Sequence, residues 1–299
     1  MTAFIAFARP HTIIGTVLAL VGLWAMAGQW AGGSPTAAGI VPLLVALIAA
    51  LATNVYIVGI NQITDVEIDR INKPYLPLAA DAISLRTARM WVSTAGVLAL
   101  VAAAIGGPWL LAAILIGLLV GTAYSVRPLR LKRYHLAAAA AIASVRALTV
   151  NLLVYAHFHW VVLGQVRIPQ HVWALTGMVL GLTIAIAWFK DIPDATGDAQ
   201  HGIGTLVLRV GLNRVLSVGL AILVACYLSL IIAGLVGLPG VDGRLLAFGH
   251  IGLLVALVII ARRIDSGNPD SLKVFYSRIW VLFFCEYLAF PAAALAGRA

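Results

Sequence analysis

Long apolar stretches alternate with short polar segments along the whole chain. A helix needs about 20 apolar residues to cross a bilayer, and nine stretches come near that length. Because a backbone in lipid must satisfy its hydrogen bonds internally, continuous apolar runs of this kind are helices. No polar linker divides the series, so the pattern predicts one all-α domain over residues 1–299, a polytopic membrane bundle of nine transmembrane helices. The predicted spans are residues 12–30, 37–60, 87–105, 109–125, 136–157, 172–189, 215–234, 245–261 and 279–295.

Composition agrees with a membrane protein, since 62% of the residues are hydrophobic and only 10% are charged. The net charge of +9 could indicate nucleic acid, but the placement of the charge argues against that. The N-terminus and the loops after the second, fourth, sixth and eighth stretches carry sixteen of the twenty Lys and Arg residues. Cytoplasmic loops are enriched in these residues, so we expect the N-terminus in the cytoplasm and the C-terminus on the opposite side.

The first stretch has some features of a cleavable signal peptide, with Arg9 before it and small residues within it. It is long enough to span and leads directly into another apolar stretch, so we expect it to be a retained transmembrane helix. No Ser- and Arg-rich transit segment precedes it, which favours a bacterial inner or photosynthetic membrane.

Two acidic clusters stand at the ends of the second and sixth stretches. The segments NQITDVEID (61–69) and DIPDATGD (191–198) contain six of the eleven acidic residues. A carboxylate at mid-bilayer costs roughly 2.5–3.5 kcal/mol on insertion scales, so clustered carboxylates indicate ion or substrate chemistry. Each could also be a solvated helix end, but two clusters on one membrane side at helical spacing favour a shared site.

The spacing within each cluster places its polar side chains on one helix face. Asn61, Asp65 and Asp69 would lie within an arc of about 80° if the second helix continues. Asp191, Asp194 and Asp198 would span about 60°. Two such faces form a set of hard oxygen ligands of the kind that Mg²⁺ prefers, with room left for water and phosphate oxygens. Basic loops follow both acidic helix ends and fit an anionic substrate, although these residues could instead serve only as membrane anchors.

Arg146 lies ten residues inside the fifth stretch, where no membrane interface explains it. We expect it to face the bundle interior and to meet either an anionic ligand or Glu286 in the ninth stretch. Asn151 lies five residues further, about 140° around an α-helix, so the two need not share a face. Arg9 and His11 precede the first helix and could bind a phosphate or anchor the chain at the interface.

Three segments carry a resemblance to a known family: RPHTIIGT (9–16), NQITDVEID continuing to NKPYLPLA (72–79), and FKDIPDATGD (189–198). With these motifs the chain resembles the UbiA superfamily of intramembrane aromatic prenyltransferases. Within it, the chain looks like the homogentisate prenyltransferase branch and its phytyltransferase-like members. The resemblance covers essentially the whole chain and implies the UbiA-type fold.

The resemblance also implies an activity: transfer of a phytyl or geranylgeranyl group from its diphosphate to homogentisate, with loss of CO₂, in tocopherol or prenylquinone biosynthesis. Mg²⁺ would be held by the catalytic and metal-binding set Asn61, Asp65, Asp69, Asp191, Asp194 and Asp198. The basic residues expected to bind the diphosphate are Arg70, Lys73, Arg130, Lys132 and Lys190. Arg146 and Asn151 are the residues expected to bind the acceptor, with Arg146 favoured as the partner of its carboxylate.

Two other interpretations stay open at this stage. One is another UbiA-type enzyme, such as a homogentisate solanesyltransferase, a chlorophyll synthase or a hydroxybenzoate polyprenyltransferase. The other is an ion-coupled transporter, in which carboxylates near the bilayer midplane would bind the transported ion. The acidic clusters lie at one membrane face, which favours the enzyme. The partners expected are the two substrates and the lipid bilayer, with no nucleic acid; the oligomeric state and the prenyl length are left open.

Overall fold

The computed structural model describes residues 3–29, 39–192 and 205–297. Within this part of the chain the regular structure is entirely helical, and nine helices are long and apolar enough to cross a membrane. Eight of them are single helices: α2 (Pro10–Gly28), α3 (Ile40–Thr64), α5 (Leu85–Gly106), α6 (Pro108–Ser125), α9 (Gln170–Phe189), α12 (Leu212–Val236), α13 (Gly243–Arg262) and α14 (Pro269–Ala296). The ninth combines α7 (His135–Ala143), η3 (Ser144–Val154) and α8 (Tyr155–Leu163). The prediction of nine membrane helices is confirmed.

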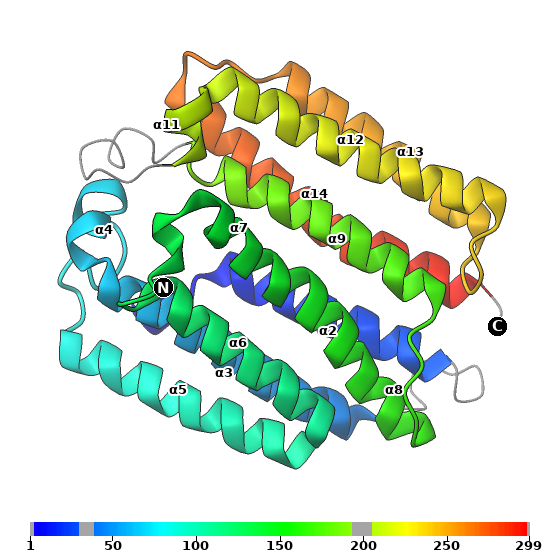
Figure 1. Ribbon diagram of the computed structural model, residues 1–299, viewed down its shortest axis with the longest axis horizontal. Coiled ribbons are helices and arrows are strands. Elements are labelled where there is room, and N and C mark those ends of the chain that lie inside the picture. The colour runs from blue at the N-terminus through cyan, green and yellow to red at the C-terminus, as the bar shows by residue number, and fades with distance from the viewer. Residues whose placement is uncertain (1–2, 30–38, 193–204, 298–299) are drawn as a thin grey trace.

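Six of the long helices form a closed ring. Around it α2 contacts α3, then come α6, the α7–η3–α8 helix, α9 and α14, which returns to α2. The helix α5 packs outside α3 and α6, while α12 and α13 pack against α9 and α14 (Figure 1). The outer helices expose large apolar side chains, such as Ile105, Val236 and Phe248, as a surface in contact with lipid requires.

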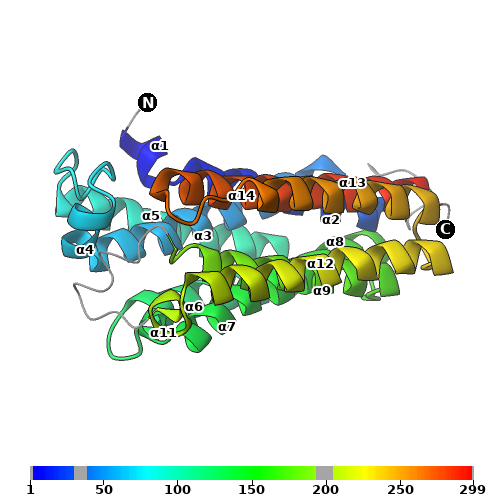
Figure 2. The same cartoon turned by 90° about the horizontal axis from the view of Figure 1, so that it is seen from above.

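The helices run side by side, and their ends gather at two opposite poles (Figures 1 and 2). One pole carries the N-terminus with α1 (Ala3–Phe7), together with α4 (Val66–Asn72) and α11 (Leu206–Val210). The C-terminus lies at the other pole. The ends of α3 and α9, where the acidic clusters begin, therefore share the pole of the N-terminus, as expected. That this pole is cytoplasmic remains a prediction from the charge distribution.

The second membrane helix does not continue through its acidic cluster as expected. It ends at Thr64, Asp65 has φ −117° and ψ 14°, and the short helix α4 starts at Val66. The carboxylate of Asp65 accepts hydrogen bonds from Arg130 and Lys132 in the loop after α6, which fixes the residue at the bend. The arc of about 80° that assumes an unbroken helix therefore does not apply.

The fifth membrane helix differs from a regular α-helix in its middle. Residues Ser144–Val154 form a π-helix, in which hydrogen bonds join residues five apart. The hydroxyl group of Thr149 likewise donates to the carbonyl oxygen of Ser144. Residues five apart lie close to one face of such a helix, so the separation of about 140° between Arg146 and Asn151 does not apply.

Candidate functional site

The ring of helices encloses a cavity of about 1810 Å³. Small-molecule pockets commonly measure about 300–1,000 Å³, so this cavity is large enough for a long substrate or for two substrates together. Its lining changes character along its length. Charged side chains line the end near α4, apolar side chains of α3 and α6 line one wall, and aromatic side chains of α14 line another.

Four members of the expected catalytic and metal-binding set line the charged end. They are Asn61, Asp65, Asp69 and Asp191. The amide group of Asn61 donates hydrogen bonds of 3.3 Å to Asp65 Oδ2 and to Ser125 Oγ, so the amide helps to orient the carboxylate. The remaining two members, Asp194 and Asp198, lie outside the described residues.

Two cations from the loop after α6 converge on Asp65. Arg130 Nη2 lies 3.1 Å from Asp65 Oδ1, and Lys132 Nζ lies 2.6 Å from Asp65 Oδ2. Lys132 also donates a hydrogen bond to Thr64 Oγ1. Burial lowers the pKa of Lys132, while the charge of Asp65 acts in the opposite direction. This partly buried group of charges holds two cations at the charged end, where Lys73 also lines the cavity.

Asp69 is the most buried carboxylate at this end, with a relative exposure of 6%. Its Oδ2 has no hydrogen-bond partner among the described residues. Burial raises the pKa of Asp69 to about 6, against the lowering effects of Lys73 and Arg9. A buried oxygen without a partner needs an explanation, and a bound cation is a standard one.

The charged end therefore fits a hard cation such as Mg²⁺, by donor chemistry and by the unpaired oxygen of Asp69. No group of three or more acidic, His or Cys side chains in metal-binding arrangement occurs within the part of the chain that the structure describes. Mg²⁺ commonly takes only one or two protein carboxylates and completes its shell with water and phosphate oxygens. The described carboxylates are sufficient for such a site.

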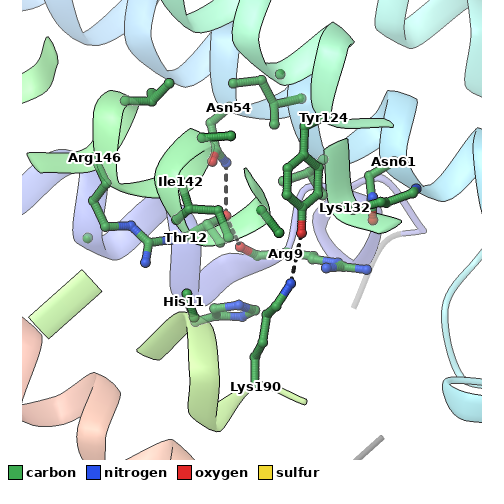
Figure 3. Close-up of a pocket in the computed structure, with 18 of the residues that line it drawn as sticks. Arg9, His11, Thr12, Asn54, Asn61, Tyr124, Lys132, Ile142, Arg146 and Lys190 are labelled. Atoms are coloured by element: carbon green, nitrogen blue, oxygen red, sulfur yellow. Dashed lines mark hydrogen bonds between the residues drawn. The ribbon is translucent and has the colours of Figure 1, made fainter. Parts of the chain in front are cut away.

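Lys190, at the end of α9, also points into the cavity rather than out to an interface (Figure 3). Its Nζ donates a 2.8 Å hydrogen bond to the hydroxyl group of Tyr124 and lies 3.7 Å from Asp191 Oδ1. This cation comes from the opposite side of the ring from α3. Lys190 therefore adds a positive charge that is independent of the Asp65 group.

Arg70 does not reach the cavity, contrary to the expectation that it binds the diphosphate. Its guanidinium group forms ion pairs with Glu67 at 3.2 Å and Asp81 at 3.0 Å on the protein surface. The break of the helix at Asp65 explains this, because the helix α4 that follows has its own direction and carries Arg70 on its exposed side.

Arg146 lines the middle of the cavity and does not pair with Glu286. Its Cζ lies 4.8 Å from the centroid of the Trp280 ring and 5.5 Å from that of Phe283, and Nη1 has no hydrogen-bond partner among the described residues. Glu286 instead accepts a hydrogen bond from His250 at 3.1 Å, in a pair that is fully buried between α13 and α14. The structural alternative for Arg146 is therefore wrong, which leaves its guanidinium group available for an anionic ligand.

Asn151 is fully buried and is not among the residues that line the cavity. Its side-chain oxygen accepts a 2.7 Å hydrogen bond from the hydroxyl group of Tyr287, which does line the cavity. The position of Asn151 thus suits a residue that fixes Tyr287, and not one that contacts a ligand directly.

The sequence interpretation missed the aromatic wall of the cavity. Tyr276, Trp280, Phe283 and Tyr287 all line the cavity from α14. Their spacing of four, three and four residues is that of one helix face, so the pattern was available in the sequence. It was not informative alone, because aromatic stripes at this spacing usually pack in a core.

The comparisons with known proteins identify the family. The model of the UbiA prenyltransferase family matches residues 13–284. The chain belongs to this family. Among curated relatives of this UbiA-family protein, "Homogentisate phytyltransferase" of Synechocystis is 41% identical, covering 97% of this chain and 95% of the relative. "Homogentisate geranylgeranyltransferase" of Triticum aestivum is 35% identical, covering 97% of this chain and 72% of the relative.

Solved structures share the fold of this UbiA-family protein. The UbiA homologue from Archaeoglobus fulgidus bound to DMAPP and Mg²⁺ has a TM-score of 0.68 at 19% identity, covering 97% of this chain and 99% of that one. The expected UbiA-type fold is thus confirmed. Family membership also makes the protein a prenyltransferase, and the transporter interpretation is not supported.

Proposed function

We propose that this protein transfers a phytyl or geranylgeranyl group from its diphosphate to homogentisate, with Mg²⁺ at the charged end and with loss of CO₂. The observation that carries the proposal is the cavity itself. It joins a cation-rich end with carboxylates to an apolar wall and an aromatic wall, and the aromatic wall holds an arginine that has no carboxylate partner among the described residues. The names of the Synechocystis and Triticum relatives support homogentisate as the acceptor.

The charged end fits a prenyl diphosphate. Mg²⁺, held by the side chains Asn61, Asp65, Asp69 and Asp191 and by Asp194 and Asp198 outside the described residues, would neutralise the diphosphate and make it a better leaving group. Arg130, Lys132, Lys190 and Lys73 surround the same space and stabilise negative charge as it develops on the leaving oxygen. The bound cation and diphosphate in the Archaeoglobus homologue support this assignment.

The apolar wall fits the prenyl chain. Ala50, Thr53 and Ile57 of α3 line this wall together with Ala113 and Gly117 of α6, the helix packed beside α3. These small and aliphatic side chains leave a channel with little polar surface. An allylic cation formed beside them is shielded from water, which would otherwise capture it.

The aromatic wall fits homogentisate. An arginine fork binds a carboxylate through two hydrogen bonds, and Arg146 is held over the rings of Trp280 and Phe283. Bound there, the hydroquinone ring would lie among the aromatic side chains of α14, between the carboxylate site and the prenyl channel. A ring carbon ortho to a hydroxyl group then attacks the prenyl carbon that loses the diphosphate.

Purified protein in liposomes, given homogentisate and prenyl diphosphates of increasing length, tests the proposal. We expect release of CO₂ and diphosphate and formation of the prenylated methyl quinol with phytyl or geranylgeranyl diphosphate, and no turnover in EDTA. Asp65→Asn should lower turnover by about 100-fold, as loss of a preorganised electrostatic group does. Glu67→Gln is the matched control, because Glu67 is an exposed carboxylate two residues away that pairs with Arg70.

Other outcomes would redirect the proposal. A preference for solanesyl diphosphate would make the protein a homogentisate solanesyltransferase. Prenylation of hydroxybenzoate or of a chlorophyllide in place of homogentisate would reject the proposed acceptor. Full turnover in EDTA, or in Asp65→Asn, would reject the metal-dependent reaction.

A further inference from the structure

His11 is a cavity-lining base that the proposed reaction has not yet used. It stands in the first turn of α2, one residue after Pro10, and lines the cavity instead of lying at an outer interface. Neither of its ring nitrogens has a hydrogen-bond partner among the described residues. The sequence left open whether His11 binds a ligand or anchors the chain at the interface. Its place in the cavity lining favours a ligand, because an anchoring residue would point away from the cavity.

His11 and Arg146 both contact the indole ring of Trp280. The imidazole ring meets the Trp280 ring edge to face, with centroids 5.1 Å apart, and the guanidinium group of Arg146 lies 4.8 Å from the centroid of the same Trp280 ring. Both side chains project into the cavity from different helices (Figure 3). The charged groups that interact electrostatically with His11 are Arg9 and Arg146. No carboxylate among the described residues has such an interaction with it.

The other bases that line the cavity belong to its charged end. These are Asp65, Asp69, Asp191 and His135. Asp65 already holds two cations, and Glu286 is bound to His250 on the outer side of α14. Among the described residues, His11 is therefore the one cavity-lining base in contact with the aromatic wall, beside the arginine that is proposed to hold the carboxylate of the acceptor.

We propose that His11 is the general base of the transfer step and accepts the proton of the acceptor hydroxyl group. The inference rests on the proposed function and extends it by naming the residue that activates the acceptor. A compact aromatic acid anchored by its carboxylate on Arg146 has its hydroxyl groups only a few ångströms away, within reach of an imidazole on the same indole ring. A base placed in this way usually contributes about 10²–10⁴-fold to the rate.

The loss of CO₂ is a separate step, in which the bond between the methylene carbon and the carboxyl carbon breaks and its electron pair takes up a proton from water. In the transfer step, bonds and protons move in the following order. The hydroxyl proton passes to His11, and the O–H electron pair forms a ring carbonyl. Ring π electrons form the new carbon–carbon bond to the prenyl group, and diphosphate leaves with the C–O electron pair. The ring ketone then returns to the phenol as the proton of the attacking carbon moves to the oxygen, and protonated His11 gives its proton to the diphosphate.

The test compares wild-type protein with His11→Asn and His11→Gln, which keep polarity but cannot accept the proton. We expect kcat for transfer to fall about 100-fold while the KM values of both substrates and the release of diphosphate by hydrolysis change little. The variant rate should rise about tenfold per pH unit between pH 7 and 9, because the phenolate replaces the missing base. A ring-fluorinated homogentisate, whose hydroxyl group is more acidic, should recover more activity in the variants than in wild type.

Arg146→Gln is the contrasting variant, since loss of a binding group should raise the KM for homogentisate. Variants with the pH profile of wild type, or with diphosphate release lost to the same degree as transfer, would overturn the role of His11. A wild-type rate that itself climbs tenfold per pH unit would overturn it without any variant. Failure of the proposed function is distinguishable, because wild-type protein would then not prenylate homogentisate at all.

Discussion

Asp65 organises the charged end of the cavity because it meets partners from two segments. Asn61 precedes it by one helical turn, and Arg130 and Lys132 reach it from the loop between α6 and α7. Ion pairs of this kind between partly buried groups keep more of their strength than exposed ones, which are worth about 0–1 kcal/mol. Substituting one buried cation and one exposed cation tests this difference in strength.

Lys132→Gln should raise the KM for prenyl diphosphate about tenfold, or about 1.4 kcal/mol, with a smaller change for homogentisate. The matched control is Arg70→Gln, which removes a cation that points to the surface and pairs with Glu67 and Asp81. Steady-state kinetics with each substrate varied in turn measures both. Equal effects of the two substitutions would show that general surface charge, and not the cavity, attracts the diphosphate.

Asp69 should make cation binding sensitive to mildly acidic pH. Burial raises its pKa to about 6, and a carboxyl group binds a metal ion only when deprotonated. The affinity for Mg²⁺ should therefore be full above pH 7 and fall as the pH drops through 6, by up to about tenfold per pH unit. Calorimetric titration with Mg²⁺ between pH 5 and 7.5 measures this.

Asp81→Asn provides the control for this pH dependence, because Asp81 is exposed and bound to Arg70. The control should keep the wild-type profile, whereas Asp69→Asn should bind Mg²⁺ weakly at every pH. A Mg²⁺ affinity that does not change between pH 5 and 7.5 would contradict the assignment of Asp69 as a ligand.

Among the helices, α14 separates two polar sites. On its inner side Trp280, Phe283 and Tyr287 face Arg146 and the cavity, and on its outer side Glu286 binds His250 of α13. The π-helical segment opposite carries Arg146 toward the cavity and Asn151 toward Tyr287. Arg146 and Glu286, which the sequence suggested as partners, thus lie on different sides of α14 and contact different helices.

Glu286→Gln should lower thermal stability, because it weakens a buried hydrogen bond to His250 and costs about 1–3 kcal/mol. Arg146→Gln should leave the melting temperature nearly unchanged while it impairs use of homogentisate. The double variant should show the sum of the two free-energy changes within about 0.5 kcal/mol, as expected for sites that do not interact. Thermal unfolding in detergent measures all three variants. A double variant more stable than Glu286→Gln alone would indicate that Arg146 and Glu286 interact directly.

At the scale of the whole molecule, we expect the six-helix ring to set how long a prenyl chain can enter. Ala113 of α6 lines the cavity, so Ala113→Phe should place a ring in the apolar channel. We expect the KM for phytyl diphosphate to rise at least about tenfold and that for geranyl diphosphate to change little. Competition between the two diphosphates in one assay measures the shift.

Leu115→Phe is the control for this change, because Leu115 lies two residues further on α6 and is 41% exposed on the outer surface. It should keep the wild-type preference. Equal loss of both diphosphates in Ala113→Phe would indicate a general packing defect and would contradict a chain-length channel in this place.

The sequence by itself determined the nine membrane helices, since apolar length and backbone hydrogen bonding leave a chain in lipid little choice. It also determined that the starts of both acidic clusters share one pole, because an even number of crossings separates the ends of α3 and α9. Asn61, Asp65, Asp69 and Asp191 all lie at that pole.

Only the tertiary structure decided which charged residues reach the cavity. Arg70 and Lys73 are three residues apart, yet only Lys73 lines it, because the bend at Asp65 sets the direction of α4. Arg146 and Glu286 were plausible partners from depth alone, but their helices turn them to different sides of α14. Such choices depend on helix rotation and on a local change from α- to π-geometry, and both arise from packing between segments far apart in the sequence.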